Sequence, residues 1–289
     1  MKNIVILGCE NSHANSFLSI IKKTEKFADV NVLGVYSDER VAAERLNATF
    51  GVAVMDTYDQ FVGKVDGVIV TARHGDNHYK YAKPYISSGM CFFIDKPVTI
   101  SGDEALEFMQ KCKAVGAKVT GGSCLKYADF IKELANDVAN EVDGKTIGGS
   151  MRGPVKMNNP YGGFYFYAQH LVEMVTTPYG NYPNSISAYK TGNNINAIFH
   201  YDGFDVNALF TDEIFTYFGS RYAEKANKTA DFSFGDEAFF TEFDEFYDLV
   251  DGKDQKISYE DFIAPVFILN AIESAVESGK EQPVRRVTL

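Results

Sequence analysis

The sequence predicts two domains: an N-terminal α/β domain built on a doubly wound parallel sheet, then an α+β domain whose sheet is mostly antiparallel. Up to residue 122, short apolar runs alternate with amphipathic segments, the pattern of strand-helix-strand units. Farther on, the apolar residues repeat every second position, and glycines and acidic residues separate the runs. We therefore place the domains at residues 1–122 and 123–289.

The elements of the first domain follow from its apolar runs. The predicted strands are residues 4–7, 30–36, 67–71, 91–94 and 118–121. The predicted helices between them are residues 15–25, 39–50, 77–88 and 103–115. Several of these helices end near a glycine that can cap them. Ligands of such a sheet bind beyond the carboxyl ends of its strands, so we look for a site there.

The second domain opens with a predicted helix at 126–142 and closes with helices at 237–250 and 262–278. Between residues 185 and 234, period-two alternation predicts strands, with Ile195, Ala197, Phe199 and Tyr201 on one face. Asp202-Gly203 predicts a hairpin turn, because glycine readily adopts the backbone angles that such a turn needs. These strands and this turn together predict an antiparallel sheet.

Composition excludes several classes of function. The net charge of −11 opposes binding to nucleic acid or to an anionic membrane. No apolar run approaches the ~20 residues of a membrane span, and the N-terminus is typical of a first strand rather than a signal peptide. The four cysteines form no C-x-x-C pair, and His74 and His78 lie in a glycine-bearing loop, so we predict no metal site. We expect a cytoplasmic protein that acts on a small molecule.

The stretch ILGCENSHANSF follows the first strand and departs from the glycine pattern of a dinucleotide-binding turn. Gly8 matches the first glycine, whereas Glu10 and His13 occupy the other two glycine positions. A carboxylate facing a pyrophosphate is repulsive. Asn11, Ser12 and His13 can instead donate hydrogen bonds to phosphate at the start of the first helix. Alternatively, Asn11 and Ser12 only cap that helix.

The end of the second strand bears on cofactor choice. Ser37-Asp38 stands where an acidic residue holds the ribose 2′-hydroxyl of NAD, or where serine and arginine accept the phosphate of NADP. Asp38 would repel that phosphate, so the sequence favours NAD over NADP. Alternatively, Asp38 is only the N-cap of the next helix.

The stretch FFIDKPVT places Asp95-Lys96-Pro97 at the carboxyl end of a predicted strand. A lysine at this position can donate to a substrate oxygen. Taken alone, the tripeptide also suits an exposed lysine in a strand-to-helix turn that Pro97 fixes.

Together with TARHGDNHYKYAKPYISSG and GGFYFYAQHLVEM, this tripeptide resembles the Gfo/Idh/MocA family of sugar and cyclitol oxidoreductases, and the resemblance covers essentially the whole chain. It implies a Rossmann domain that binds NAD or NADP. Asp95-Lys96-Pro97 is similar to the family's E-K-P motif, which implies that Lys96 hydrogen-bonds the reacting hydroxyl. His78 would then lie near the nicotinamide, and Thr71 and Asp95 would join the cofactor-binding residues.

The resemblance also implies a second half of the site, on a helix that follows Gly162-Gly163. There His170 would be the acid or base, as suits a side chain that titrates near neutral pH. The position of the family's aspartate holds Phe166. Glu173 shares the helix face of His170 and can orient its ring or raise its pKa. Lys126 and Tyr167 are further candidates for contact with the substrate. Alternatively, Phe166, His170 and Glu173 form a packed helix face without a catalytic task.

The main hypothesis is an NAD(P)-dependent oxidoreductase that acts on a hydroxyl of a sugar, cyclitol or related polyol. The alternative from another class is a non-catalytic metabolite-binding or regulatory protein that has lost its cofactor turn, which Glu10 and Phe166 favour. The third hypothesis is a lyase or glycosidase that uses bound NAD transiently. We expect a homo-dimer or tetramer through the C-terminal sheet, on an exposed face carrying Phe199, Tyr201 and Phe210.

Overall fold

The computed structural model describes residues 1–289, and the chain divides into two units. The first consists of Met1–Gly122, Phe239–Phe262 and Leu289, and the second of Ser123–Ala238 and Ile263–Thr288. The sequence places a single boundary after residue 122. The structure has a break there, but it also returns residues 239–262 to the first unit, because the apolar side chains of that segment complete the core of the first unit.

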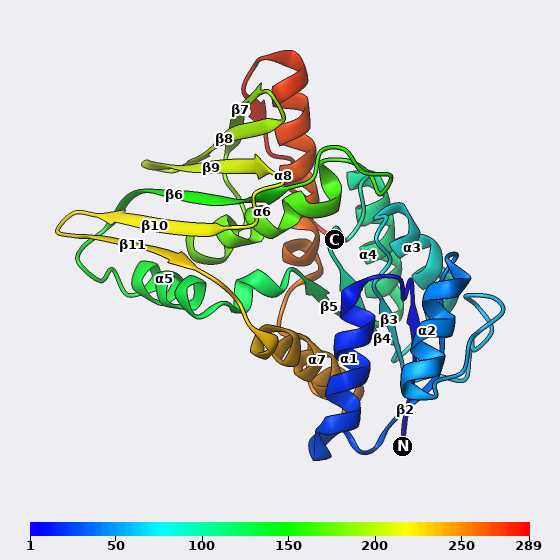
Figure 1. Ribbon diagram of the computed structural model, residues 1–289. Helices are drawn as coiled ribbons and strands as arrows, with labels where there is room; N and C mark the ends of the chain where they lie inside the picture. The colour runs from blue at the N-terminus through cyan, green and yellow to red at the C-terminus, as the bar shows by residue number, and fades with distance from the viewer. The chain divides into compact units, whose positions relative to one another are not determined.

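The first unit is built on five parallel strands in the order β2-β1-β3-β4-β5 (Figure 1). They are β1 (Lys2–Leu7), β2 (Val30–Tyr36), β3 (Gly67–Val70), β4 (Cys91–Asp95) and β5 (Lys118–Gly122). Every residue of β3 and β4 is buried, which explains why both strands are continuous apolar runs. The predicted parallel sheet is confirmed. Because the chain passes from β1 to β2 and then back across β1 to β3, the order reverses beside β1, where such sheets bind ligands.

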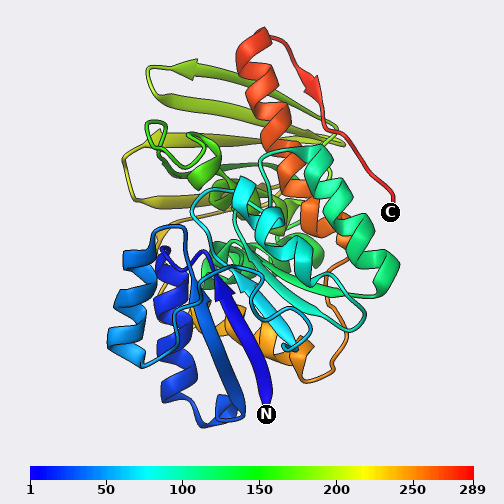
Figure 2. The ribbon, with the colours of Figure 1, turned by 90° about the vertical axis from the view of Figure 1, so that its right-hand side faces the viewer.

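Helices cover both faces of this sheet (Figure 2). They are α1 (Ser12–Lys23), α2 (Arg40–Phe50), α3 (Asp76–Ala82), α4 (Gly102–Val115) and α7 (Asp236–Val250). Neighbouring residues of β4 point to opposite faces: Phe93 meets Phe17 of α1 at 5.0 Å between ring centroids, and Phe92 meets Phe108 of α4 at 6.0 Å. Helix α3 ends at Ala82 rather than near residue 88, because the chain continues as a 3-10 turn that contains Pro84.

Helix α7 lies beside α1 in Figure 1 and belongs to the core on that face of the sheet. Phe243 is fully buried, and its ring lies 5.5 Å from that of Phe17 and 4.8 Å from that of Phe27. Phe246 and Leu249 follow at helical spacing and are buried in the same cluster. The first unit therefore obtains part of its core from a segment more than a hundred residues away in sequence.

The second unit is built on a seven-stranded sheet of order β11-β10-β6-β9-β8-β7-β12. Its strands are β6 (Thr146–Val155), β7 (Ser185–Thr191), β8 (Asn194–Tyr201), β9 (Phe204–Asp212), β10 (Tyr217–Ala223), β11 (Asn227–Phe232) and β12 (Gln282–Pro283). All pairs are antiparallel except β6 with β9, so the predicted mostly antiparallel sheet is confirmed. The predicted hairpin at Asp202-Gly203 joins β8 to β9, and Gly203 has φ of +85°.

Four helical elements accompany this sheet: η3 (Cys124–Tyr127), a 3-10 turn, followed by α5 (Asp129–Ala139), α6 (Tyr165–Tyr179) and α8 (Tyr259–Ser278). Helix α6 packs on the face that carries Phe210, whose ring lies 5.4 Å from that of Phe164. Phe199 and Phe210 are fully buried on this face, so the prediction that they are exposed is wrong. The alternation itself is correct, but α6 covers the more apolar face, and the opposite face is the one that stays open.

None of the helices combines the length and the apolar character that crossing a bilayer requires.

Candidate functional site

The turn after β1 requires glycine at position 8. Gly8 has φ of +74°, and a Cβ at this position would lie 2.4 Å from backbone atoms of Ala72. The backbone N–H of Gly8 donates to the Tyr36 carbonyl at 2.8 Å, and Thr71 Oγ1 donates to the Gly8 carbonyl at 3.1 Å. The turn is thus fixed between the carboxyl ends of β2 and β3. Thr71, predicted to bind cofactor, is fully buried and holds this turn.

The start of α1 fits an anion such as the pyrophosphate of a dinucleotide. Asn11 is the N-cap residue but makes no side-chain cap, and the first turn of α1 contains no acidic residue. The first backbone N–H groups of the helix therefore have no carboxylate from their own turn, and together with the helix dipole they favour a phosphate. The Asn11 side chain donates to Asp95 Oδ2 at 2.9 Å instead, and Ser12 Oγ donates to Asn11 Oδ1 at 3.2 Å.

Glu10 is bound at the strand ends. Ser37 Oγ donates to Glu10 Oε2 at 2.7 Å, and the backbone N–H of Arg73 donates to Oε1 at 2.9 Å. Two donors that follow β2 and β3 therefore hold its carboxylate. The repulsion expected from the glycine pattern assumes that this charge faces the pyrophosphate without partners. In the structure, two hydrogen-bond donors hold the carboxylate.

His13 is buried between two carboxylates. Nδ1 lies 3.3 Å from Asp95 Oδ2, and Nε2 lies 3.3 Å from Glu242 Oε2 on α7. Burial opposes protonation, but the charges of Asp95 and Glu242 outweigh it and raise the pKa of His13. The expected hydrogen bond from this side chain to phosphate does not match these contacts, because both ring nitrogens face protein carboxylates.

Asp95 and Lys96 lie at the carboxyl end of β4, as the sequence predicts. Asp95 is fully buried, and its Oδ1 accepts from the backbone N–H of Lys96 at 2.7 Å. Asn11 and His13 contact the other oxygen, Oδ2. Asp95 therefore links the glycine turn to the Lys96-Pro97 segment. Lys96 is only 3% exposed, and the bond to Pro97 is cis.

His78 is also fully buried. Its Nε2 lies 2.7 Å from the Ala72 carbonyl, to which it donates. Burial lowers the pKa of His78, so the ring is neutral. The contact ties α3 to the segment that meets Gly8. The predicted position near the nicotinamide stays a prediction.

Ser37 and Asp38 directly follow β2, as expected, but they differ in surroundings. Ser37 is buried and contacts Glu10. Asp38 is about half exposed; Tyr36 Oη donates to its Oδ1 at 2.6 Å, and Lys80 Nζ lies 3.6 Å from its Oδ2. Burial opposes ionisation of Asp38, but the hydrogen bonds of Tyr36 and Tyr81 and the charge of Lys80 outweigh it and lower the pKa of Asp38.

In the second unit, the predicted residues gather around His170 on α6. His170 is 5% exposed, and its Nδ1 lies 2.6 Å from Ser123 Oγ. The Tyr167 ring meets the His170 ring edge to face at 4.8 Å. Phe166 contacts the rings of Tyr161 and Tyr167, so an aromatic cluster surrounds the position at which the resemblance implies an aspartate. Sequence reasoning missed Ser123, which directly follows Gly121-Gly122.

Glu173 reaches His170 through Ser123. Its Oε1 accepts from the backbone N–H of Ser123 at 2.9 Å and from Gln169 Nε2 at 2.6 Å, and its Oε2 lies 3.6 Å from Lys126 Nζ. Burial raises the pKa of Glu173, although Lys126 and the hydrogen bonds act in the opposite direction. Glu173 therefore connects two of the predicted residues, Lys126 and His170, to the backbone at Ser123.

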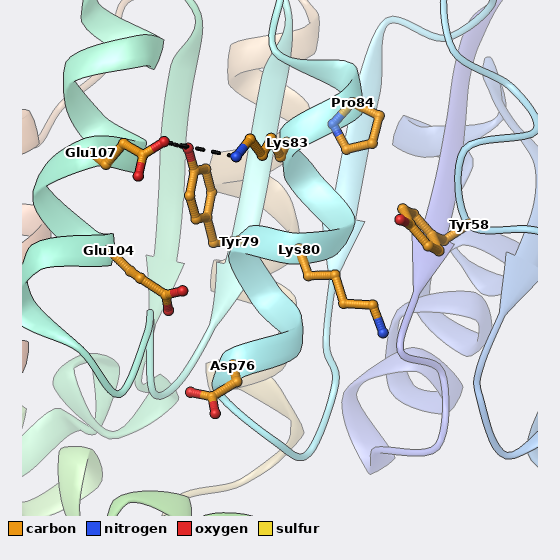
Figure 3. A pocket seen from close by; sticks show the side chains of 8 residues that line it. All are labelled: Tyr58, Asp76, Tyr79, Lys80, Lys83, Pro84, Glu104 and Glu107. Atoms are coloured by element: carbon orange, nitrogen blue, oxygen red, sulfur yellow. Dashed lines mark hydrogen bonds and ion pairs between the residues drawn. The ribbon is translucent and has the colours of Figure 1, made fainter.

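A pocket of about 430 Å³ lies elsewhere on the first unit, over α3 and α4 (Figure 3). It is lined by Tyr58, Asp76, Tyr79, Lys80, Lys83, Pro84, Glu104 and Glu107. Glu107 Oε1 accepts from Tyr79 Oη at 2.7 Å and lies 3.8 Å from Lys83 Nζ, so charged groups here pair with one another. No predicted site residue lines this pocket, and we do not place the site there.

Comparisons with known proteins agree with this geometry. Residues 2–123 match the family GFO_IDH_MocA, described as an oxidoreductase family with an NAD-binding Rossmann fold. No curated protein sequence matches the chain.

Solved structures show the same fold over the whole chain. Myo-inositol 2-dehydrogenase from Lactobacillus plantarum has a TM-score of 0.84 at 14% identity, covering 98% of this chain and 99% of that one. Apo scyllo-inositol dehydrogenase from Lactobacillus casei has a TM-score of 0.84 at 12% identity, covering 98% of each chain. GenD2 from gentamicin A biosynthesis, in complex with NAD, has a TM-score of 0.85 at 15% identity, covering 98% of this chain and 96% of that one. Residues 2–123 therefore match the NAD-binding domain of the Gfo/Idh/MocA oxidoreductases, and the whole chain shares the fold of these solved structures.

Proposed function

We propose that the protein is an NAD(P)-dependent oxidoreductase that transfers a hydride between the nicotinamide cofactor and a hydroxyl-bearing carbon of a sugar, cyclitol or related polyol. The observation that carries this is the turn at Gly8, which leads into a helix N-terminus without a side-chain cap, in a domain of an NAD-binding family. The inositol dehydrogenases among the similar structures support a polyol as substrate.

Two side chains are proposed to act on the hydroxyl. When bound, the nicotinamide accepts a hydride from the carbon that bears this hydroxyl. Lys96, buried at the carboxyl end of β4, would donate a hydrogen bond to the oxygen. His170 would take the hydroxyl proton at Nε2, because Nδ1 faces Ser123. Ser123 would fix the tautomer of the ring in place of the carboxylate that often does so.

The cofactor preference is proposed to be NAD over NADP, because negative charge near the end of β2 would repel the 2′-phosphate of NADP. The cytoplasmic location stays a prediction from the sequence.

We further propose a homo-dimer or tetramer that forms through the open face of the second sheet. A row of residues crosses that face from strand to strand: Tyr189, Asn196, Leu209, Arg152 and Phe218. Tyr189 is 57% exposed and Leu209 is 38% exposed, although both lie within strands. An exposed row with large apolar members on a broad sheet is typical of a subunit interface.

Calorimetric titration with NAD⁺ and an absorbance assay for NADH, using myo-inositol, scyllo-inositol and aldoses, test the proposed activity. We expect the wild-type chain to bind NAD⁺ and to oxidise at least one polyol. Lys96→Met and His170→Asn should each keep NAD⁺ binding but lower kcat by about 10²- to 10⁴-fold. Absence of dinucleotide binding would contradict the proposal, and binding without turnover of any polyol would favour the non-catalytic alternative.

A further inference from the structure

We propose that Glu10 binds the hydroxyls of the adenosine ribose of NAD and excludes the 2′-phosphate of NADP, so that the residue occupying a glycine position of the turn selects the cofactor. This inference rests on the proposed function, because it names the selecting residue within the same dinucleotide site.

The carboxylate of Glu10 lies at the edge of the sheet where ligands bind. Glu10 follows β1, where the strand order β2-β1-β3 reverses and ligands of doubly wound sheets bind. Its two oxygens are held by Ser37 Oγ at 2.7 Å, after β2, and by the Arg73 backbone N–H at 2.9 Å, after β3. Ser37 Oγ also accepts a hydrogen bond from the Glu39 backbone N–H at 3.0 Å, and this contact directs the Ser37 O–H toward Glu10. The carboxylate is therefore anchored at the end of β2, where the ribose of a bound dinucleotide lies.

The carboxylate of Glu10 can accept further hydrogen bonds. An ionised carboxylate offers about four acceptor sites, and the protein uses one on each oxygen of Glu10. Two sites remain, which matches the two neighbouring hydroxyls of a ribose. The partners of Glu10 are a hydroxyl and an amide, so its negative charge is not neutralised by an ion pair. A 2′-phosphate at this place would meet a full negative charge.

Asp38 occupies the usual position of the ribose-binding acid. Its Oδ1 accepts from Tyr36 Oη at 2.6 Å, and Lys80 Nζ lies 3.6 Å from Oδ2. Asp38 is thus paired with a cation, and its side chain is 52% exposed. A charge in that state discriminates less between a hydroxyl and a phosphate than the charge of Glu10 does.

The experiment is calorimetric titration of the full chain with NAD⁺, NADP⁺ and NAD⁺ that lacks the 2′-hydroxyl of the adenosine ribose. The variants are Glu10→Gln, which keeps the shape and one acceptor oxygen, and Asp38→Asn as the matched control. We expect the wild type to bind NAD⁺ about 100-fold more tightly than NADP⁺, and to lose about tenfold in affinity with the deoxy analogue. Glu10→Gln should reduce the preference for NAD⁺ by about tenfold and remove most of the deoxy penalty. Asp38→Asn should change either ratio by less than about threefold.

The outcomes separate this inference from the proposed function. If the wild type binds NAD⁺ but only Asp38→Asn changes the ratios, or neither variant does, the role of Glu10 is overturned and the oxidoreductase proposal stands. If the wild type binds no dinucleotide, both are overturned. The deoxy analogue tests the wild type directly: an unchanged affinity would overturn the role of Glu10 even if Glu10→Gln failed to fold, which circular dichroism would reveal.

Discussion

At the scale of single residues, Glu173 shows how a buried charge can connect a site. It is 7% exposed, and its carboxylate contacts the backbone N–H of Ser123, the side-chain amide of Gln169 and the ammonium of Lys126. Ser123 in turn faces His170. Burial raises the pKa of Glu173 above its ordinary value of 4.5, so the folded chain holds this proton to a higher pH than the unfolded chain does.

This pKa shift predicts how stability depends on pH. The contribution of Glu173 is fully present below its unfolded pKa and is lost as the pH rises through the raised folded pKa. Glu173→Gln cannot ionise, so its unfolding free energy relative to that of the wild type should increase across this window, by at most about 1.4 kcal/mol per pH unit. Urea unfolding at several pH values from 4.5 upward checks this, with the exposed Glu277→Gln as control. A difference that stays constant with pH would contradict it.

The residues of the site differ in how far the sequence could predict them. Lys96 directly follows a recognisable strand and His170 comes after Gly162-Gly163, so pattern and resemblance suffice to propose both. Ser123 and His170 are 47 positions apart, and only folding brings them together. The same holds for Glu10, whose charge suggests repulsion until Ser37 and the Arg73 backbone are placed against it.

At the scale of elements, helix α7 joins a core that is formed mostly by the start of the chain. Its amphipathic pattern predicts a helix but not which domain its apolar face covers, because periodicity shows only that a face is buried. The sequence also does not predict strand β6 (Thr146–Val155). Its sequence TIGGSMRGPV contains three glycines and one proline, which weaken a strand pattern, although the close approach of Tyr179 Oη, 2.4 Å from a Cβ placed at Gly149, favours glycine there.

The place of α7 can be tested by truncating its central aromatic residue. Phe243 is fully buried against Phe17 and Phe27, so Phe243→Ala should lower the free energy of unfolding by about 3–5 kcal/mol. Phe240 lies on the same helix but is 38% exposed, and Phe240→Ala should cost less than about 1.5 kcal/mol. Urea denaturation measures both variants. Equal losses would mean that α7 does not contribute to the core in this way.

At the scale of the whole molecule, the sheet of the second unit keeps one face open, and large apolar side chains lie exposed on that face. The sequence predicted that one face of the sheet stays free, but it assigned Phe199 and Phe210 to that face, because alternation cannot tell which face a helix will cover. The open face instead presents Tyr189 and Leu209, with Asn196 between them in the cross-strand row. Asn196 Nδ2 donates to Tyr189 Oη at 2.6 Å, which holds the tyrosine along the sheet.

Sedimentation velocity at micromolar concentration tests whether this face joins subunits. We expect a dimer or tetramer for the wild type, because a two-fold interface repeats the same row on both subunits and buries Leu209 against its partner. Leu209→Asp should shift the protein toward monomer, because each two-fold contact would then bury two like charges near each other. Val41→Asp, on α2 and 57% exposed, adds the same charge elsewhere and should leave the assembly unchanged. A monomeric wild type, or equal sedimentation of wild type and Leu209→Asp, would show that the open face is not the interface.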